Sequence, residues 1–373
     1  MVKISKKPAC DCGCNGDGAS PSEKKHPGLQ PDFIIGSYPS GEKSVPLVST
    51  TWSRTDRLSA LKVRWSIGRM HYKVDPGIYA VGKPGDQSLV FVTANYKLSF
   101  DHLRRGLDGL DAWILVLDTK GINVWCAAGK GTFGTKELVR RIRIHHLADL
   151  VTHRRIILPQ LSATGVAAHE VKKMTGFSVT YGPVRAVDIK AFLDSGLKAG
   201  ERMRTVTFSL ADRLKLIPVD IFYAKYYLLL IPALFFLLSG LNPHGYSIEM
   251  AVETGSRSIL NLFAGYLSGC ALTPILLPWI PFRRFSLKGL LVGWLVALFL
   301  MGAGTLGNNA VEIGSWFLIM GGLSSFMAMN FTGSSTFTSL SGVQKEMKTA
   351  IPVQITMTAL GLAGWIFTRF IIL

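Results

Sequence analysis

One cysteine stands where a short helix is expected to begin. Cys126 follows Asn123, a residue type that favours the capping position at a helix N-terminus. In the first turn, the positive end of the helix dipole stabilises a thiolate. The three residues after Cys126 are Ala, Ala and Gly, which leave room for a broad, flat partner. A thiol in such a place serves as a metal ligand, a redox thiol or a nucleophile, and spacing alone leaves all three open.

Strands and helices alternate around this cysteine. We expect strands at residues 77–81, 88–94, 112–117, 155–158 and 177–181, and helices at 100–110, 134–150, 165–173 and 187–195. Such alternation predicts an α/β fold with a Rossmann-like parallel sheet covered on both faces. Ligands of such sheets bind outside the carboxyl ends of the strands. The segments after Val92, Leu117 and Leu158 are therefore candidate binding loops.

Nucleotide motifs are missing from these segments. The sequence lacks a GxGxxG turn, and Gly129-Lys130 lacks the earlier glycine of a phosphate-binding loop. It also lacks zinc-finger spacing and the aromatic motifs of RNA-binding domains. We therefore expect no nucleotide cofactor and no nucleic-acid partner.

Charge divides the chain into two unlike halves. Residues 1–221 carry 33 Lys and Arg against 20 Asp and Glu, whereas the remainder is apolar with few charges. We expect a flexible tail at 1–30, a cytoplasmic domain at 31–200, a linker at 201–220 and a transmembrane domain at 221–373. The basic excess favours attraction to anionic lipid headgroups, so membrane lipid is an expected partner.

Five apolar segments follow residue 220. They cover residues 221–241, 258–280, 287–306, 311–329 and 351–373, each about the 20 residues that a membrane-spanning helix needs. The second and fourth loops carry Arg283, Arg284, Lys288, Lys345 and Lys348, whereas the first and third are poor in Lys and Arg. The positive-inside rule then places the N-terminal half in the cytoplasm and the C-terminus outside. With no apolar signal segment at residues 1–30, we expect a multi-pass protein of the cytoplasmic (inner) membrane.

Few charges fall within these segments. Intramembrane charge is typical of transporters, so its scarcity favours an anchor over a transport pathway. Cys270 lies inside the second segment, where a buried structural thiol is expected rather than a metal ligand.

The run NVWCAAGKGTFGT at residues 123–135 resembles a known motif. It is similar to the cap helix of the mercury-methylating corrinoid proteins, the HgcA family, and more distantly to the large subunit of the corrinoid iron–sulfur protein of acetyl-CoA synthesis. Residues 92–97, 158–161 and 165–166 resemble further corrinoid-facing loops of these proteins. Membrane spans after the soluble domain are typical of the mercury-methylating family and not of its soluble relative.

The resemblance implies a corrinoid cofactor, a cobalamin bound base-off, with Cys126 as the cysteine ligand of cobalt in place of the nucleotide base. The helix against the ring would consist of Asn123, Val124, Trp125, Cys126, Ala127, Ala128, Gly129 and Lys130. The ring edge and tail would meet Thr93, Asn95, Leu158, Gln160 and Gly165.

The same resemblance implies methyl transfer to mercury(II), which gives methylmercury. A donating thiolate suits this chemistry, because mercury(II) is electron-poor and the methyl group must bring electrons with it. The implied partners are a ferredoxin-like protein with two 4Fe–4S clusters and a methyl-folate-dependent methyltransferase as the methyl source. Two alternatives stay open: a membrane-anchored corrinoid methyl carrier of one-carbon metabolism, and a non-enzymatic membrane metal-binding or sensor protein.

Two further groups have competing interpretations. Cys10, Cys12 and Cys14 do not match ferredoxin spacing, and they are either chance residues of a flexible tail or soft ligands that collect mercury(II). The basic cluster of residues 140–146 is either a solvated or lipid-facing surface or a docking face for an acidic ferredoxin-like partner.

Overall fold

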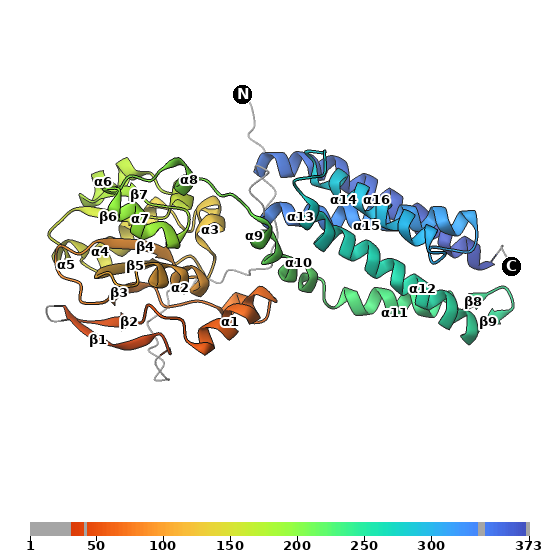
Figure 1. Ribbon diagram of the computed structural model, residues 1–373, viewed down its shortest axis with the longest axis horizontal. Coiled ribbons are helices and arrows are strands. Elements are labelled where there is room, and N and C mark those ends of the chain that lie inside the picture. The colour runs from red at the N-terminus through yellow and green to blue at the C-terminus, as the bar shows by residue number, and fades with distance from the viewer. Residues whose placement is uncertain (1–30, 41–42, 335–339, 371–373) are drawn as a thin grey trace, which may run out of the picture.

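The computed structural model describes residues 31–40, 43–334 and 340–370. An α/β half and a helical half lie end to end, as Figure 1 shows. Cys10, Cys12 and Cys14 lie outside the described residues, so the expectation for this tail stays a prediction.

The described part of the α/β half contains one seven-stranded sheet in the order β1-β2-β3-β5-β4-β6-β7. The strands are β1 (Ile34–Ser40), β2 (Lys43–Val48), β3 (Gly77–Val81), β4 (Val90–Ala94), β5 (Ala112–Leu117), β6 (Arg155–Leu158) and β7 (Ser178–Tyr181). Strands β5, β4, β6 and β7 are mutually parallel.

The sheet is mixed rather than wholly parallel, which corrects the expectation. Strand β3 runs antiparallel to β5, with Gly77 opposite Val116 and Val81 opposite Ala112. Strands β1 and β2 form an antiparallel hairpin that the sequence analysis missed. This hairpin lies at one edge of the sheet, and most of its side chains are exposed or half-buried. It contains Pro39 and Pro46 and lacks the apolar run that marks a central strand.

Helices cover both faces of the sheet. Helices α2 (Lys97–Gly106) and α7 (Ile189–Asp194) pack on one face, and α4 (Thr135–Ile144) and α6 (Ala168–Thr175) pack on the other. The expected helix at 134–150 is divided, because His146 adopts a left-handed conformation between α4 and α5 (Leu147–Leu150). Three short 3-10 turns complete this half: η1 (Arg69–His71), η2 (Gln160–Ser162) and η3 (Ala186–Asp188).

Helix α1 (Arg54–Arg64) is held against α2 by a buried ionic cluster. Arg104 donates to Asp101 at 2.8 Å and to Asp56 at 2.6 Å, and Lys97 donates to both carboxylates at 2.7 Å. Arg104 and Asp101 have no exposed surface. Removal of one partner would leave a buried charge uncompensated, so the cluster fixes α1 firmly.

This cluster predicts acid sensitivity. Burial raises the pKa of Asp56, but hydrogen bonds from Lys97 and Arg104 more than offset this and lower the pKa to about 2. The folded-state pKa therefore lies below the unfolded one, so the stabilisation is present above about pH 4 and is lost as pH falls toward 2. We expect the difference in unfolding free energy between wild type and Asp56→Asn to shrink by about 2 kcal/mol over that range. Denaturant unfolding of both proteins in detergent at several pH values measures this difference. A difference that stays constant between about pH 4 and pH 2 would contradict the role of the Asp56 carboxylate.

The helical half contains apolar helices of membrane-spanning length. Among the described residues, four segments are long and apolar enough to cross a bilayer: Ile248–Leu276, Phe285–Gly302, Ala310–Gly333 and Gly342–Phe370. The first segment consists of helix α12 (Ile248–Leu267), the π-helix η4 (Ser268–Leu272) and α13 (Thr273–Leu276). The second is α14 (Phe285–Gly302), and the third is α15 (Ala310–Asn330) with the turn η5 (Phe331–Ser334). The fourth lies in α16 (Leu340–Phe370). A hairpin of β8 (Leu241–Asn242) and β9 (Gly245–Tyr246) precedes α12.

The first expected span differs from the others. Helix α11 (Tyr227–Ser239) has 13 residues, too few to cross the hydrocarbon core alone. It passes the same test only together with the segment Leu210–Phe222, from which it is bent by 57°. That segment contains α9 (Leu210–Leu214) and α10 (Ile217–Tyr223). The structure therefore gives four spans, or five if this bent pair counts as one.

The helical half also contains a charge pair that the sequence analysis did not anticipate. Glu312 and Arg369 lie in the fourth and fifth expected spans, and their side chains form a buried ion pair of 2.7 Å. Asn308 donates its backbone N–H to the same carboxylate at 3.0 Å. The pair ties α15 to α16, which gives these two charges within the apolar helices a structural role.

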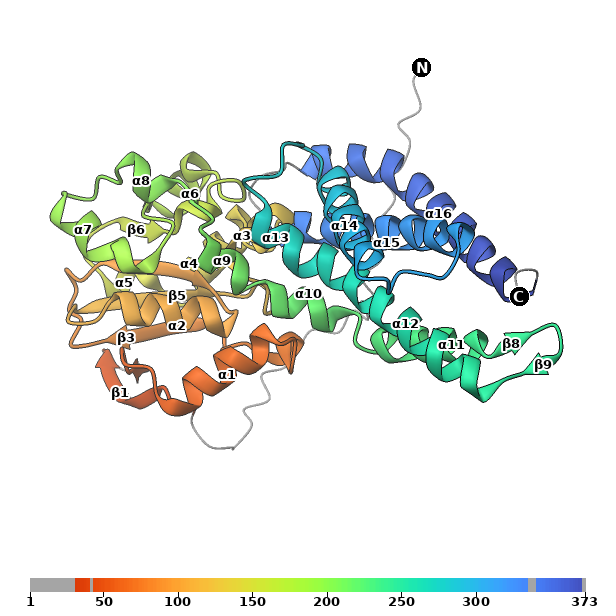
Figure 2. The ribbon, with the colours of Figure 1, turned by 45° about the vertical axis from the view of Figure 1, so that its right-hand side comes forward.

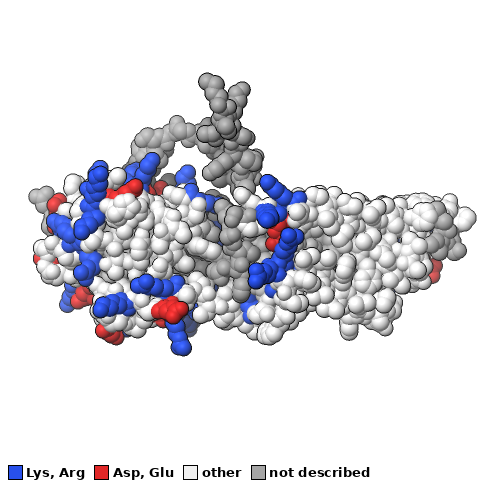
Figure 3. Space-filling view, turned by 90° about the horizontal axis from the view of Figure 1, so that it is seen from above, with Lys and Arg blue, Asp and Glu red and all other residues white. Residues whose placement is uncertain are grey.

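The two halves meet at a short, well-anchored junction. Arg213 of α9 is buried and donates to the carbonyls of Pro274 and Ile275, at 2.9 and 2.7 Å. The exposed cations Arg283 and Arg284 lie in the loop before α14, and Figure 3 shows a band of Lys and Arg where the halves meet. Helix α16 begins at Leu340 rather than at residue 351, so the exposed Lys345 and Lys348 lie in its first turns and not in the expected loop. The hairpin β8–β9 and the last turns of α16 lie at the opposite end in Figures 1 and 2. The positively charged segments thus share an end with the α/β half.

Candidate functional site

The connections of the parallel strands diverge between β4 and β6. From β4 the chain crosses to β5 through α2 on one face, and from β6 it crosses to β7 through α6 on the other face. Such a divergence opens a crevice outside the carboxyl ends of the two strands. The crevice lies at two of the three segments that the sequence indicated.

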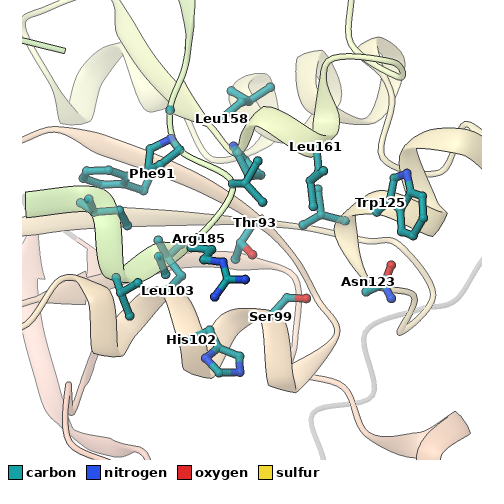
Figure 4. Close-up of a pocket in the computed structure, with 18 of the residues that line it drawn as sticks. Phe91, Thr93, Ser99, His102, Leu103, Asn123, Trp125, Leu158, Leu161 and Arg185 are labelled. Carbon is teal, nitrogen blue, oxygen red and sulfur yellow. The ribbon is translucent and has the colours of Figure 1, made fainter. Parts of the chain in front are cut away.

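A cavity of about 570 Å³ occupies this crevice, within the usual range for small-molecule sites. Thr93 and Leu158 line it from the strand ends, and Asn123 and Trp125 line it from the segment after β5. Figure 4 shows Trp125 and Asn123 on one side and Ser99, His102 and Arg185 on another. Segments that lie far apart in the sequence therefore build this cavity together.

Helix α3 (Val124–Lys130) begins as the sequence predicts. The Asn123 side chain accepts a hydrogen bond of 2.9 Å from the backbone N–H of Cys126, so the expected cap is confirmed. The helix ends at Gly131, which adopts a left-handed conformation with φ +81°. Capped at both ends, this helix of seven residues is held in one place.

The two faces of α3 differ in burial. Ala127 and Ala128 face the core, whereas Trp125, Cys126, Gly129 and Lys130 share the outer face. Cys126 is a free, half-buried thiol. It lies beside the cavity but is not among the described side chains that line it. The cavity therefore leads to the edge of α3 that carries Trp125, next to the thiol.

Gly129 leaves the space beside the thiol open. A Cβ atom added at Gly129 would meet no other atom within 4 Å. Gly129 lies three residues after Cys126 and thus on the neighbouring turn of the same face. On the outer face of α3, the described residues therefore leave the space next to Cys126 uncovered at Gly129.

Asn95 positions this helix from below. Its side-chain oxygen accepts from the N–H and the hydroxyl of Thr119, at 3.1 and 2.8 Å, and from the N–H of Gly121 at 2.9 Å. Its amide donates to Asp118 at 3.2 Å. These bonds fold the loop between β5 and α3, so Asn95 is a positioning residue rather than a free contact for a ligand.

We expect Asn95→Ala to destabilise the α/β half by about 3 kcal/mol, because the N–H groups of Thr119 and Gly121 lose their acceptor and each buried unpaired group costs about 1–3 kcal/mol. Denaturant unfolding measures the loss. Gln87→Ala, a change at an exposed loop residue that hydrogen-bonds Thr152, is the control and should cost less than about 1 kcal/mol. A similar cost for both variants would contradict the role of Asn95.

Some of the other expected site residues line the cavity, and others pack against α3 or lie on the surface. Thr93 and Leu158 line the cavity, whereas Gln160 lies half-buried beside it in the turn after β6. Gly165 supports α3, since an added Cβ would approach the Phe133 carbonyl oxygen at 2.3 Å and the Ala128 Cα at 2.9 Å. Lys130 is exposed at the end of α3.

Sequence reasoning missed the polar wall of the cavity. Ser99 and His102 come from α2, Arg185 from the loop after β7, and Lys215 from the end of α9. Burial and the charge of Arg64 lower the pKa of His102. Arg185 donates to Asp212 at 2.6 Å, which ties the cavity wall to α9, the helix that precedes the apolar helices. Only the fold brings these residues together, and no sequence spacing connects them.

Most of the α/β half is similar to a known protein family. Residues 55–193 match the CdhD family model. That family is described as the CO dehydrogenase/acetyl-CoA synthase delta subunit. The match runs from α1 to α7, so it covers α3 and most of the cavity and stops short of the apolar helices.

Several curated relatives resemble part of this chain. The acetyl-CoA decarbonylase/synthase complex subunit gamma of Archaeoglobus fulgidus is 30% identical over 128 residues, which cover 34% of this chain and 27% of the relative. The corresponding subunit of Methanopyrus kandleri is 28% identical over 145 residues, which cover 38% and 31%. Subunit gamma 2 of Methanosarcina mazei is 35% identical over 95 residues, which cover 24% and 20%. The chain thus spans less than a third of the length of these relatives.

Proposed function

We propose that the α/β half holds a corrinoid against the outer face of α3, with Cys126 as the lower ligand of cobalt. The observation that carries this proposal is α3 itself: its outer face holds a free thiol one turn from the open space at Gly129, and the start of the same helix, at Asn123–Trp125, lines the cavity between β4 and β6. The motif at residues 123–135, which resembles the cap helix of corrinoid proteins, supports the same assignment. The relatives are subunits of acetyl-CoA decarbonylase/synthase complexes, which agrees with one-carbon chemistry.

When bound, the corrinoid would supply a methyl group for transfer to an acceptor. Cys126 would hold the cobalt by its sulfur and would donate electron density to the metal, as thiolate ligands do in haem proteins. Trp125 and Lys130 flank the sulfur on the same face and would orient the ring. Asn123 and Asn95 would act only through α3, by fixing its first turn.

We propose mercury(II) as the acceptor and methylmercury as the product. An electron-rich thiolate ligand favours delivery of a methyl group together with its electrons, which is what an electron-poor soft cation requires. The combination of this cysteine with apolar helices of membrane-spanning length also supports the resemblance to the mercury-methylating family. In this proposal the α/β half faces the cytoplasm, on the side of the positively charged segments.

A membrane-anchored corrinoid methyl carrier is the second candidate. The names of the curated relatives favour it, since each is a subunit of an acetyl-CoA decarbonylase/synthase complex. A carrier passes its methyl group to another enzyme and need not act on mercury(II).

The candidates imply partners. Delivery of a methyl group together with its bonding electrons, as the mercury candidate requires, would need a two-electron reductant before the next methyl cation could be accepted, and a ferredoxin-like protein with two 4Fe–4S clusters would supply these electrons. A methyl-folate-dependent methyltransferase would supply the methyl group. The described residues contain no group of three or more His, Cys, Asp or Glu side chains placed to hold another metal ion.

The experiment that separates the candidates uses the full-length protein in detergent, loaded with methylcobalamin. We expect methylmercury to form on addition of mercury(II) without a second enzyme. Loading shown by the visible spectrum, together with no methylmercury, would overturn the mercury assignment and leave the carrier. Absence of loading would overturn the corrinoid assignment.

A further inference from the structure

Large apolar side chains lie exposed along one edge of the α/β half. Leu58, Leu61 and Trp65 are spaced three and four residues apart, so they share one face of α1. Ile67 and Met70, just beyond the helix, are 60% and 76% exposed. We call these five residues the apolar ridge. The opposite face of α1 is the one that carries Asp56 and packs on the domain.

Cations flank the apolar ridge. Residues 54–73 contain six Lys and Arg and a single acid, Asp56, which is buried in the ionic cluster with Arg104. Arg54, Arg57, Lys62 and Lys73 are exposed. An apolar face bordered by exposed cations is typical of segments that lie in the interface of an anionic bilayer.

The apolar ridge is continuous with the start of the membrane helices. The ring of Trp65 packs against Phe222 of α10, with centroids 4.9 Å apart. Three residues later come Lys225, Tyr226 and Tyr227, all exposed at the beginning of α11, where aromatic and basic residues are typical of the headgroup level. Figures 1 and 2 both show the end of α1 directed toward α10. The apolar ridge therefore lies at the expected level of the bilayer surface.

We propose that residues 54–73 form an interfacial segment that binds the surface of an anionic bilayer. The apolar ridge enters the boundary between headgroups and acyl chains, and the flanking cations bind lipid phosphates. Each Lys or Arg near such a surface contributes about 1 kcal/mol. This surface contact is separate from the anchoring by the spans and does not depend on the proposed corrinoid.

The same segment touches the loop that leads to α3. A Cβ atom at Gly121 would lie 3.6 Å from the Lys73 Cβ and 3.8 Å from the Met70 carbonyl oxygen. The Arg69 guanidinium lies 5.8 Å from the centre of the Tyr96 ring, next to Asn95. Contact with the bilayer therefore fixes the orientation of the candidate site relative to the membrane surface.

Hydrogen exchange of the full-length protein tests this proposal. In nanodiscs that contain phosphatidylglycerol, we expect the amides of residues 65–73 to exchange about tenfold or more slowly than in phosphatidylcholine nanodiscs, because several cations each contribute binding energy. The double variant Ile67→Glu/Met70→Glu should lose this difference. Met174→Glu, at a methionine that is 49% exposed on α6, should keep it.

Two results would overturn the proposal. Equal exchange in both nanodiscs would show that the segment does not bind an anionic surface. Equally slow exchange in detergent without lipid would show that another part of the protein, or a second copy, covers the apolar ridge.

Discussion

Cys126→Ala should abolish methyl transfer to mercury(II) while the protein remains folded. Loss of a group that only hydrogen-bonds to a metal ligand typically lowers activity by about 10–100-fold. Loss of the ligand itself should therefore lower the rate of methyl transfer by more than about 100-fold. The thiol is half-buried, and its removal opens no large cavity, so the unfolding free energy should change by less than about 1 kcal/mol. The rate of methylmercury formation by protein loaded with methylcobalamin, together with denaturant unfolding, measures both effects.

Cys270→Ala is the matched control for this variant. Cys270 is fully buried in the π-helix η4, far along the chain from α3, and it should leave methyl transfer unchanged. Equal loss of activity in both variants would point to general damage by thiol removal. Retained activity in Cys126→Ala would contradict the assignment of the ligand.

Gly129→Leu should block corrinoid binding and leave the fold intact. The new side chain would project into the open space on the outer face of α3, beside Cys126. Leucine favours a helix over glycine by about 0.8 kcal/mol, so the helix itself should not weaken. We expect the dissociation constant for cobalamin, followed by the visible spectrum, to rise by at least about tenfold, since overfilling a fitted site typically costs about 1–3 kcal/mol.

Gly85→Leu provides the comparison for this steric test. An added Cβ at Gly85 also meets no atom within 4 Å, but Gly85 lies in the loop that precedes β4, at the end of the strand opposite to the one from which α3 follows its neighbour β5. This variant should bind cobalamin as the wild type does. Unchanged binding in Gly129→Leu would show that the corrinoid does not lie on this face of α3.

Local signals identified the core of the site from sequence. Strand β5 has six consecutive buried residues, and an apolar run of that length marks a central strand wherever it occurs. The cap formed by Asn123 depends on contacts within three residues. Both features are local, so sequence reasoning placed α3 and Cys126 after the strand as the structure has them.

Features that depend on distant contacts were not predictable in the same way. Asn95 has the residue type of a ligand contact, yet its oxygen is occupied by a loop that lies 24–26 residues later. Helix α1 owes its position to Arg104, which lies 48 residues beyond Asp56. Arg185 and Lys215 reach the cavity only because the chain returns to it after β7. The spacing of these residues along the sequence does not indicate that they lie close together in the fold.

The helical half shows the same division. Apolar length predicted the later spans, and α12 begins at Ile248, ten residues before the expected span, because Ser247 caps it. The bend between α10 and α11 was missed, since a continuous apolar run does not reveal a break in helix direction. The ion pair between Glu312 and Arg369 likewise depends on the packing of α15 against α16, because the two residues lie 57 positions apart in the sequence.

The most direct test of the central claim is the cobalt X-ray absorption spectrum of the full-length protein loaded with cobalamin. The proposed ligation by Cys126 predicts a sulfur scatterer in the first coordination shell of the wild type and its absence in Cys126→Ala. A wild-type spectrum with only nitrogen and oxygen scatterers would contradict the account.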